Sequence, residues 1–517
     1  MSSRTYYITT PIYYVNDVPH IGHAYTSLAC DVLARFMRLD GRDVHFLTGT
    51  DEHGQKIEKA AAAAGMAPQA FTDKVSQSFR DLVVAMNYSP DNFIRTTEPR
   101  HYAACQALWE KLVAAGDIYL GKYAGWYSVR DETYFVEGET EVGPDNKRRA
   151  ISTGADVEWV EEPSYFFKLS AWADRLLAFY EKNPGFIGPD SRRNEVISFV
   201  RGGLQDLSVS RTSFSWGIPV PGDPKHIMYV WLDALTNYIT ECGYPDTNSP
   251  LWKYWPADLH MVGKDIIRFH CVFWPAFLMA AGLEPPRRVF AHGWWTNEGQ
   301  KISKSLGNVI DPVALAKTYG LDPVRYFLLR EVPFGNDGDF QKRALIGRLN
   351  GDLANAYGNL CQRVLSIVAK SCDGKVPAKG PLQAPDNALI GRARGLLAVV
   401  RAELDEQAFH RALAAIWEVV ADANRYVDAQ APWALAKTDP ARRDTVLWVL
   451  AETIRRVTLL VQPFMPDSTA RILDQLAVPA DGRTFAAFER ELASGIALPK
   501  PQGVFPRFVE APPKAAS

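Results

Sequence analysis

Two histidines that flank a glycine are the first residues of this sequence whose types and spacing indicate chemistry. His20-Ile21-Gly22-His23 follows Pro19 and opens a segment with helical periodicity. A glycine at a helix N-terminus lets an anionic ligand approach the backbone N–H groups, and the helix dipole favours negative charge there. The two imidazoles add donors for phosphate oxygens. The motif therefore predicts a phosphate-binding helix start, against the alternative of an accidental cluster.

A lysine-rich loop is the second candidate for phosphate chemistry. Lys301-Ile302-Ser303-Lys304-Ser305, followed by Leu306-Gly307-Asn308, is expected after a strand. Lysine supplies mobile positive charge where negative charge develops during phosphate transfer. Alone, this string is as consistent with a basic surface loop. Together with the histidine motif upstream, it predicts that the two histidines and the two lysines act on a phosphate-bearing substrate.

The elements that must position these groups alternate between strand and helix. Strands are expected at residues 6–9, 44–47, 93–95, 259–262 and 289–291, and helices at 21–39, 229–240 and 266–281. This βαβ order is typical of a doubly wound parallel sheet, with the fold class α/β. The expected divisions are residues 1–115 and 229–292 for the two halves of that domain, 116–228 for an inserted α+β domain, 293–344 for the lysine loop and a linker, 345–498 for a helical bundle and 499–517 for a tail.

Helical periodicity dominates the C-terminal part of the chain. Apolar residues recur at Leu349, Leu353, Ala356, Leu360 and Val364, which predicts an all-α bundle that continues to about residue 476. The Pro-rich tail contains two phenylalanines, and the sequence leaves open whether it packs on the body or stays loose.

Composition sets the broad class. A chain of 517 residues is expected to form several domains, and 47% hydrophobic with 22% charged residues is ordinary for a globular protein. No apolar run is long enough for a membrane helix and no signal-peptide core opens the chain, so a cytoplasmic protein is expected. The net charge of −2 neither indicates nor excludes a nucleic-acid partner. The six cysteines show no CxxC spacing and are expected to be buried free thiols.

The two motifs together resemble the signature pair of class I aminoacyl-tRNA synthetases, and further segments are similar to the methionyl-tRNA synthetase family within it. The similar segments follow in order along the chain, at residues 8–16, 20–24, 49–54, 215–221, 229–234 and 263–266. The resemblance implies a Rossmann-like nucleotide-binding domain with an inserted α+β domain, followed by an all-α anticodon-binding bundle. It implies that ATP activates methionine to methionyl-adenylate with release of pyrophosphate, and that methionine then passes to the 3'-terminal adenosine of tRNA(Met).

The resemblance also implies a methionine site. Asp51 would hold the ammonium group, although an aspartate before a glycine loop is more often a turn residue. The residues that would line the side-chain pocket are Ile12, Tyr14, Trp231, Leu235, Tyr238, Ile266, His270 and Trp274. Their chemistry suits a thioether, which is apolar, polarizable and favourable against aromatic rings, and a Tyr hydroxyl or His N–H can point at the sulfur. The family often has proline where this chain has Leu235, and the aromatic residues could instead be ordinary core.

The nucleotide and the tRNA would contact other residues. The resemblance implies catalytic roles for His20, His23, Lys301 and Lys304, and ATP contacts for His20, Gly22, His23, Asp265 and Lys304, with Mg²⁺ accompanying the nucleotide. Arg211 would help to order the active site or form a plain surface salt bridge. The anticodon would contact Asn359, Arg363 and Trp433, because tryptophan stacks unpaired bases and Asn or Arg reads base edges; a solvated helix face is the alternative.

The chain departs from the family pattern in one region. Many members carry zinc knuckles in the inserted domain, whereas residues 119–159 contain no cysteine. No structural zinc is therefore expected, and the short insertion argues against the editing enzymes for isoleucine, valine and leucine. No extra C-terminal dimerisation module is recognised, so a monomer is expected. Three alternative interpretations remain. The first is another small-pocket synthetase. The second is a small-molecule nucleotidylyltransferase, which would not need the helical bundle, and the third is a non-catalytic tRNA-binding protein, which would not need intact histidine and lysine motifs.

Overall fold

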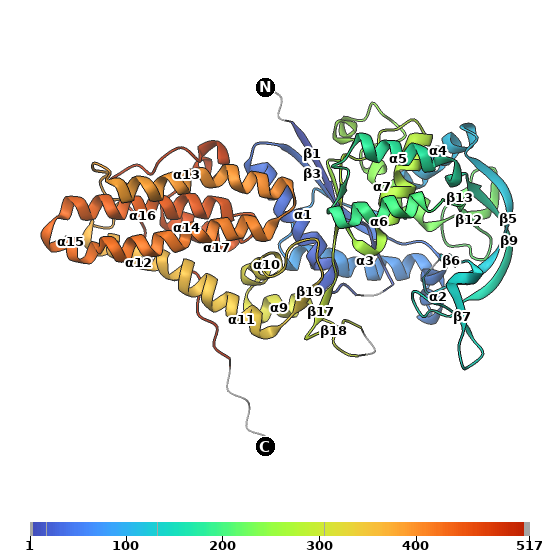
Figure 1. The fold of residues 1–517 in the computed structure, drawn as a ribbon, viewed down its shortest axis with the longest axis horizontal. Helices are drawn as coiled ribbons and strands as arrows, with labels where there is room; N and C mark the ends of the chain where they lie inside the picture. Colours follow the sequence, from blue (N-terminus) through green and yellow to red (C-terminus); the bar gives the residue numbers. More distant parts are fainter. Residues whose placement is uncertain (1–3, 17, 132, 304–305, 511–517) are drawn as a thin grey trace, which may run out of the picture. The chain divides into compact units, whose positions relative to one another are not determined.

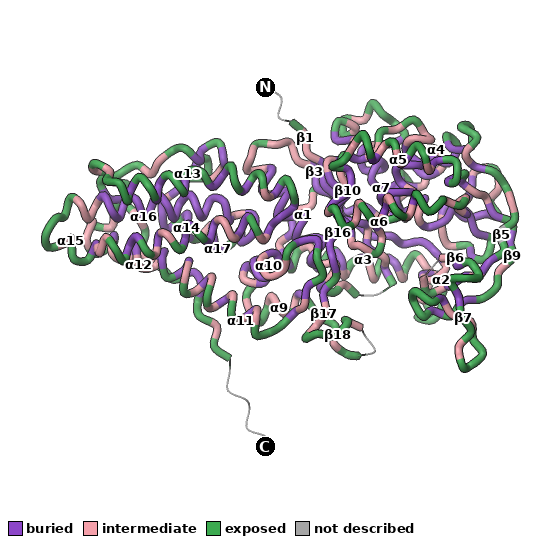
Figure 2. The backbone as a smooth tube through the Cα atoms, viewed as in Figure 1, coloured by how far each residue is buried: buried purple, intermediate pink, exposed green. Residues whose placement is uncertain are grey.

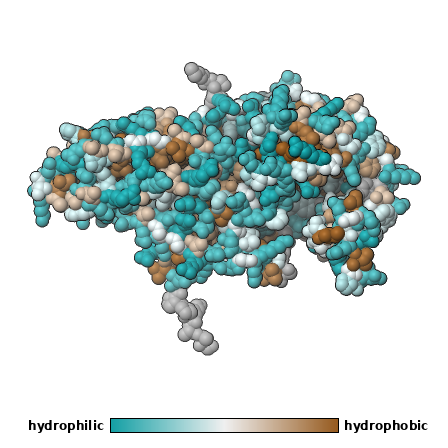
Figure 3. Space-filling view, viewed as in Figure 1, coloured by the Kyte–Doolittle hydropathy of each residue, from teal (hydrophilic) through white to brown (hydrophobic). Residues whose placement is uncertain are grey.

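The computed structural model describes residues 4–16, 18–131, 133–303 and 306–510, and the chain divides into two compact units (Figure 1). The first unit comprises Met1–Arg4, His20–Val44 and Gly293–Ser517, and the second comprises Thr5–Pro19 and His45–His292. Among the described residues, no helix has the length and apolarity needed to cross a membrane. On the face seen in Figure 3, hydrophobic residues form small groups on a mostly hydrophilic surface.

The second unit is built on a seven-stranded sheet in the order β10-β16-β15-β1-β3-β2, with β4 also paired to β3. The strands are β1 Thr5–Thr9, β2 Tyr13–Tyr14, β3 Asp43–Asp51, β4 Asn92–Arg95, β10 Ile187–Gly188, β15 Leu259–Gly263 and β16 Val289–His292. Neighbours such as β1 and β15, β15 and β16, and β3 and β4 pair in parallel, which confirms the predicted parallel sheet. Polar residues end β1, β3 and β16 at the carboxyl ends, where open α/β sheets bind ligands.

Helices and small antiparallel sheets complete the second unit. The helices are α2 Gln55–Ala63, α3 Pro68–Ala85, α4 Pro99–Ala114, α5 Ala173–Lys182, α6 Asp190–Arg201, α7 Val230–Glu241 and α8 Trp274–Ala280. The antiparallel strands are β5 Ile118–Ser128, β6 Thr133–Phe135, β7 Thr140–Val142, β8 Arg148–Ala150, β9 Glu158–Phe167, β11 Leu207–Ser208, β12 Ser210–Arg211, β13 Pro219–Val220 and β14 Asp223–Met228. They lie where the α+β insertion is expected. The structure differs at β10, which belongs to that stretch of sequence but pairs with β16 of the parallel sheet.

The helix predicted at residues 266–281 is not continuous. The structure has a 3-10 turn at Lys264–Ile266, a π-helical turn at Phe269–Phe273 and the short α8. Pro275 has no N–H, and its ring conflicts with the carbonyl four residues earlier, that of Cys271. That carbonyl instead accepts a hydrogen bond of 2.6 Å from the Tyr180 hydroxyl. Wide turns of this kind are common at functional sites.

The first unit contains α1 Ile21–Leu39, whose bounds match the sequence prediction, and the C-terminal helices. A three-stranded sheet of order β18-β17-β19 precedes them, with β17 Trp295–Asn297, β18 Gln300–Lys301 and β19 Gly338–Phe340. The helices are α9 Pro312–Tyr319, α10 Leu321–Arg330, α11 Lys342–Arg348, α12 Asn359–Ser371, α13 Ala384–Asp405, α14 Phe409–Gln430, α15 Pro432–Thr438, α16 Pro440–Val461 and α17 Pro466–Gln475, with a π-helical segment at Leu349–Gly358. The predicted helical region is confirmed.

Long helices α13, α14 and α16 run side by side in this bundle, with buried residues along their facing sides (Figure 2). The described part of the tail packs back onto the helices. Phe505 lies 5.7 Å from the ring of Tyr357, and Phe508 lies 4.9 Å from that of Tyr319, between ring centroids. Of the two possibilities that the sequence leaves open, the tail therefore takes the packed one as far as residue 510.

A buried ion pair ties α1 to α10 within the first unit. Arg325 donates from Nη2 to Asp31 at 2.6 Å, and neither side chain is exposed. Its Nε donates to the carbonyl of Phe464 at 3.0 Å. Arg325 therefore binds both α1, the helix that begins with the histidine motif, and the segment between α16 and α17.

Candidate functional site

The histidine motif forms the N-terminus of α1 as a reciprocal cap. The Gly22 N–H donates to Nδ1 of His20, and the His20 N–H donates to Nδ1 of His23, both at 3.1 Å. A Cβ at residue 22 would come within 2.9 Å of the His20 ring, so any other residue here would displace that ring. Burial and the neighbouring His20 ring lower the pKa of His23 well below its ordinary value. Since each Nδ1 accepts, both neutral rings carry their proton on Nε2, a donor of the kind a phosphate oxygen accepts.

The lysine motif was predicted to form a loop after a strand, and the structure places it at the end of a β-hairpin. Strands β17 and β18 pair around Glu298-Gly299, whose positive φ angles of 49° and 77° suit a tight hairpin turn. Lys301 ends β18 with an exposed side chain, and Lys304 and Ser305 lie outside the described residues. Asn308 closes the loop, because its Oδ1 accepts from the Ser303 N–H at 2.8 Å and its Nδ2 donates to the Lys301 carbonyl at 3.0 Å.

The structure brings these two motifs to neighbouring places in the first unit. The N–H of Ile21, in the first turn of α1, donates to the carbonyl of Ile310 at 3.2 Å, directly after the lysine loop. The N–H groups at the start of a helix have no partner inside the helix, so a carbonyl at this point also satisfies the α1 terminus. The loop and the two imidazoles therefore belong to one local arrangement.

The residues predicted for methionine all lie in the second unit. The parallel pairing of β2 and β3 places Tyr14 opposite Asp51, at the carboxyl end of β3. The remaining pocket candidates lie on or pack against one hydrophobic cluster of this unit, where Leu235, Tyr238 and Trp274 are buried and Ile12, Trp231 and Ile266 are partly buried. The structure thus gathers these candidates around one cluster, whereas Tyr14 packs against a separate one. Several of the candidates are also core aromatics, as the alternative held.

A buried pair, Tyr238 and His270, sets the polarity of this group. Nδ1 of His270 lies 3.0 Å from the carbonyl of Ile266, which can only accept, so Nδ1 carries the proton. Burial lowers the pKa of His270 to about 4, which keeps the ring neutral. Its Nε2 therefore accepts from the Tyr238 hydroxyl at 2.7 Å. The rings of Trp231 and Phe269 stack beside them, 3.6 Å apart.

The sequence interpretation missed a second histidine beneath this pair. His260 stacks on Tyr238 at 4.0 Å between ring centroids, and its Nδ1 lies 2.8 Å from the Thr9 hydroxyl. Its Nε2 accepts a long bond of 3.4 Å from the Trp274 indole. Burial lowers the pKa of His260 well below its ordinary value. The sequence offered one sign of this histidine's role, which is its position on a strand otherwise made of apolar residues.

Asp265 and Arg211 occupy different environments. Asp265 is exposed in the turn after β15, at a strand carboxyl end, and a Cβ at Gly263 would come within 2.5 Å of its carboxylate. Arg211 is buried, which corrects the surface salt bridge kept as an alternative. Its guanidinium lies 4.4 Å from the ring centre of Tyr229 and 4.7 Å from that of Tyr134. Arg211 also donates to the Ser208 hydroxyl at 2.7 Å, so it orders this region from within.

Two of the three predicted anticodon residues lie together in the first unit. The Arg363 guanidinium lies 5.4 Å from the ring centre of Trp433, and it forms an ion pair of 2.6 Å with Asp428. Trp433 is 49% exposed at the start of α15, and Asn359 is exposed at the start of α12. An exposed indole beside a guanidinium is a suitable surface for an unpaired base.

A network of buried polar residues in the second unit has no counterpart in the predicted site. Asp233 accepts hydrogen bonds from His53 and His101, both at 2.7 Å. The adjacent Glu52 forms a two-pronged ion pair with Arg95, at 2.7 and 2.9 Å. Glu52, His53 and Asp233 fall within segments that carry the family resemblance, which was the signal that could have found them.

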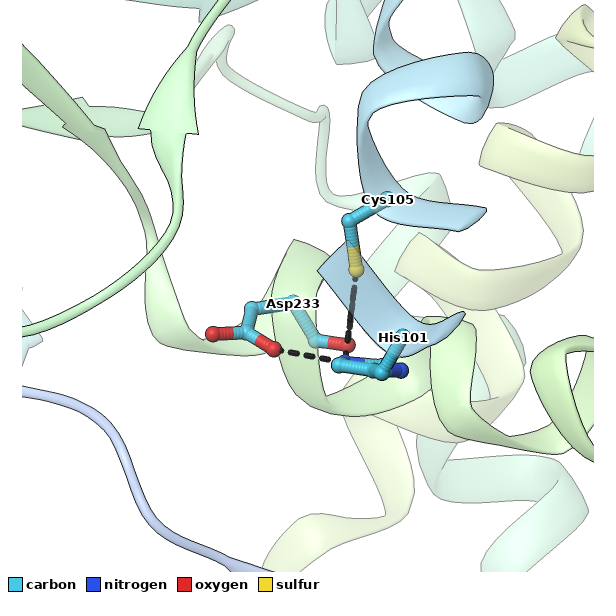
Figure 4. Close-up of side chains that lie close together, drawn as sticks. All are labelled: His101, Cys105 and Asp233. Carbon is cyan, nitrogen blue, oxygen red and sulfur yellow. Dashed lines mark hydrogen bonds and ion pairs between the residues drawn. The ribbon is translucent and has the colours of Figure 1, made fainter. Parts of the chain in front are cut away.

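Potential metal ligands gather at one place among the described residues. His101, Cys105 and Asp233 offer ligand atoms within 4.8 Å of one another (Figure 4). Five of the six cysteines are buried and all six are free, as expected.

Comparisons with known proteins agree with this geometry. The family model of class I tRNA synthetases (M) matches residues 6–149 and 140–365, and the model of the anticodon-binding domain of methionyl tRNA ligase matches residues 376–513. The methionine–tRNA ligase of Mesorhizobium japonicum is 60% identical over 514 residues, covering 99% of both chains, and that of Mycobacterium tuberculosis is 57% identical over 510 residues, covering 98% of both. The structure of the Mycobacterium tuberculosis methionyl-tRNA synthetase in complex with methionyl-adenylate superposes with a TM-score of 0.96 at 57% identity, covering 98% of this chain and all of that one. The chain belongs to the methionine–tRNA ligases, a family of class I aminoacyl-tRNA synthetases.

Proposed function

We propose that this enzyme activates methionine with ATP to form methionyl-adenylate and pyrophosphate, and then transfers methionine to the 3'-terminal adenosine of tRNA(Met). The main observation that supports methionine as the amino acid is the neutral Tyr238–His270 pair, which lies among buried aromatic rings. A thioether has no charge, bonds weakly as an acceptor and gains most from aromatic contacts. Because the Tyr238 and His270 protons already have partners, we infer that aromatic contact, more than a hydrogen bond, recognises the sulfur.

In the proposed methionine site, Asp51 binds the ammonium group at the carboxyl end of β3. The methionine side chain enters a pocket whose proposed lining residues are Ile12, Tyr14, Trp231, Leu235, Tyr238, Ile266, His270 and Trp274. Leu235 keeps the pocket apolar where relatives often have proline. Leucine and proline are both apolar, and Leu235 is buried, so this difference leaves the polarity of the proposed pocket unchanged.

The proposed phosphate site uses the first unit. The methionine carboxylate attacks the α-phosphate of ATP, so no protein nucleophile is required and catalysis consists of positioning and charge stabilisation. His20 and His23 donate from Nε2, Gly22 opens the backbone to the phosphates, and Lys301 and Lys304 bring positive charge. Asp265 is proposed to bind the ribose. These phosphate ligands are donors, so they suit phosphate oxygens; Mg²⁺ would enter with the nucleotide and screen the pyrophosphate charge.

Further assignments complete the proposal. Asn359, Arg363 and Trp433 contact the anticodon, and the domain divisions are those expected from the sequence, apart from β10, which joins the parallel sheet. The protein acts as a cytoplasmic monomer without structural zinc. The absence of cysteine between residues 119 and 159 supports the last point, since knuckle sites require thiolates.

The decisive experiment is pyrophosphate–ATP exchange without tRNA, run with each amino acid singly. Exchange with methionine alone supports the substrate and a tRNA-independent activation step. Exchange with another amino acid would refute the methionine pocket, and no exchange by folded protein with Mg²⁺ would refute the proposed mechanism. Lys304→Ala is expected to slow adenylate formation about a hundredfold or more, by analogy with the loss of one transition-state donor.

A further inference from the structure

Three buried residues of the second unit, Asp233, His53 and His101, form what we call the Asp233 clamp. The two carboxylate oxygens of Asp233 each take one imidazole N–H, from Nδ1 of His53 and Nε2 of His101. All three residues are at most 1% exposed. Burial alone would raise the pKa of Asp233, but the two imidazoles lower it to about 2, so the carboxylate stays ionised.

The clamp joins three separate pieces of chain. His53 lies two residues after Asp51, at the end of β3, and His101 lies in the first turns of α4. Asp233 lies on α7, two residues from both Trp231 and Leu235. Figure 4 shows His101 and Cys105, one turn apart on α4, extending toward Asp233. The clamp therefore links the loop that follows the proposed ammonium ligand to the helix that carries proposed pocket residues.

Further contacts hold the outer ends of the clamp. Nε2 of His53 lies 3.0 Å from the Tyr102 hydroxyl, and Nδ1 of His101 lies 3.0 Å from the Thr240 hydroxyl near the end of α7. The rings of Tyr102 and Trp216 pack edge-on against His53. Each imidazole is thus fixed at both nitrogens, which leaves little freedom for its orientation.

We propose that the Asp233 clamp is a positioning device for methionine, one that fixes the spacing between the ammonium site at Asp51 and the side-chain pocket on α7. A substrate bound at both ends is sensitive to this spacing, because catalysis and selection require groups held to within about 0.5 Å. The role rests on the methionine site proposed above.

A metal site is the other use that His101, Cys105 and Asp233 suggest. Both oxygens of Asp233 already accept short N–H bonds, so the imidazole nitrogens that face it carry protons and have no lone pair for a cation. Burial and the carboxylates of Asp233 and Asp51 raise the pKa of the Cys105 thiol, which disfavours the thiolate that a metal requires. The hydrogen-bonded clamp is the better account of these residues.

Paired substitutions separate the hydrogen bond from the bulk of each ring. The amide nitrogen of asparagine replaces Nδ1 of histidine and that of glutamine replaces Nε2. His53→Asn and His101→Gln therefore keep the donor to Asp233, whereas His53→Ala and His101→Ala remove it. Asp233→Asn leaves one oxygen for two N–H donors.

The measurement is the KM for methionine and for ATP in pyrophosphate exchange by the full-length enzyme. The alanine variants and Asp233→Asn are expected to raise the methionine KM about tenfold or more, because each loses one buried hydrogen bond. The ATP KM should stay within about twofold, because the proposed phosphate ligands His20 and His23 belong to the first unit and none of the clamp's hydrogen bonds given above joins Asp265, the proposed ribose ligand. The asparagine and glutamine variants should stay within about threefold of the parent.

Controls distinguish positioning from general destabilisation and from failure of the site itself. Leu176→Ala, which empties a buried position on α5, should lower the unfolding temperature without changing the methionine KM. If Asp51→Asn and Tyr238→Phe leave the methionine KM unchanged, the proposed pocket is wrong and the clamp role falls with it. If Asp51→Asn and Tyr238→Phe raise the methionine KM while the clamp variants do not, only the clamp role is refuted. The same holds if His53→Asn and His101→Gln raise the methionine KM as much as the alanine variants do. One equivalent of tightly bound zinc at His101 would also overturn it.

Discussion

Replacing Gly22 with alanine tests whether the His20 ring is held in a catalytic position. The new Cβ would lie 2.9 Å from Cε1 of His20, whereas ordinary contact begins at 3.4 Å, so the imidazole must withdraw by 0.5 Å. That movement breaks the cap between the residue 22 N–H and Nδ1 of His20, which costs about 1 kcal/mol. Alanine in the first turn of α1 recovers up to about 1 kcal/mol through its helix propensity. The free energy of unfolding should therefore change little.

Activity should change far more than stability. A misplacement of 1 Å can cost about a hundredfold in rate, so a displacement half as large is expected to lower kcat about tenfold. The assay is pyrophosphate–ATP exchange at saturating methionine, together with urea unfolding of the same preparation. Gly347→Ala is the matched control, because a Cβ at this position of α11 meets nothing within 4 Å. Exchange by Gly22→Ala within about twofold of the parent, at unchanged stability, would refute a positioning role for His20.

Three further outcomes are expected. Asn308→Ala should release the lysine loop and raise the ATP KM about tenfold, measured by exchange, because two backbone hydrogen bonds are lost; an unchanged KM would show that the loop is ordered without them. Arg325→Met should lower the free energy of unfolding by about 2–4 kcal/mol, since buried Asp31 keeps only Arg35 as a cation and the carbonyls of Pro463 and Phe464 lose their donor. Arg401→Met, at a half-exposed pair, should cost at most about 1 kcal/mol in the same urea experiment. Because the pKa of His270 is about 4 in the fold and ordinarily 6.5 in an unfolded chain, the unfolded state binds the proton first, so stability should fall as pH drops from 6.5 to 4. His270→Gln should show a shallower fall in urea midpoint, and an equal slope would contradict the assigned pKa.

Periodicity predicted the elements whose patterns are long and regular. Helix α1 has an uninterrupted amphipathic pattern and matches its predicted bounds, and α7 differs from its prediction by one residue at each end. Strand β3 is longer than predicted, because Thr48, Gly49 and Thr50 resemble a turn in sequence. They continue the strand by pairing with β4, and Gly49 is needed there because a Cβ would meet the Ile94 carbonyl at 2.1 Å.

The sequence identified the motifs but not the contacts that organise them. His20 and Gly22 were recognisable as a phosphate-binding helix start, while the reciprocal cap depends on side-chain geometry that spacing cannot supply. Asn308 was visible only as part of a motif, and its two bonds to the loop backbone appear only in the fold. The Asp233 clamp joins residues as much as 180 positions apart, a separation that no local pattern reports.

The neutrality of the Tyr238–His270 pair has a consequence for the rejection of wrong amino acids. A buried imidazole with a pKa of about 4 offers no countercharge at neutral pH, and the rings around it offer none either. An acidic or basic side chain that entered this proposed pocket would surrender its hydration shell without compensation, which costs several kcal/mol. Charged competitors would therefore be excluded by dehydration alone, with no repulsive group required. Only uncharged side chains of similar size would have to be told apart by shape.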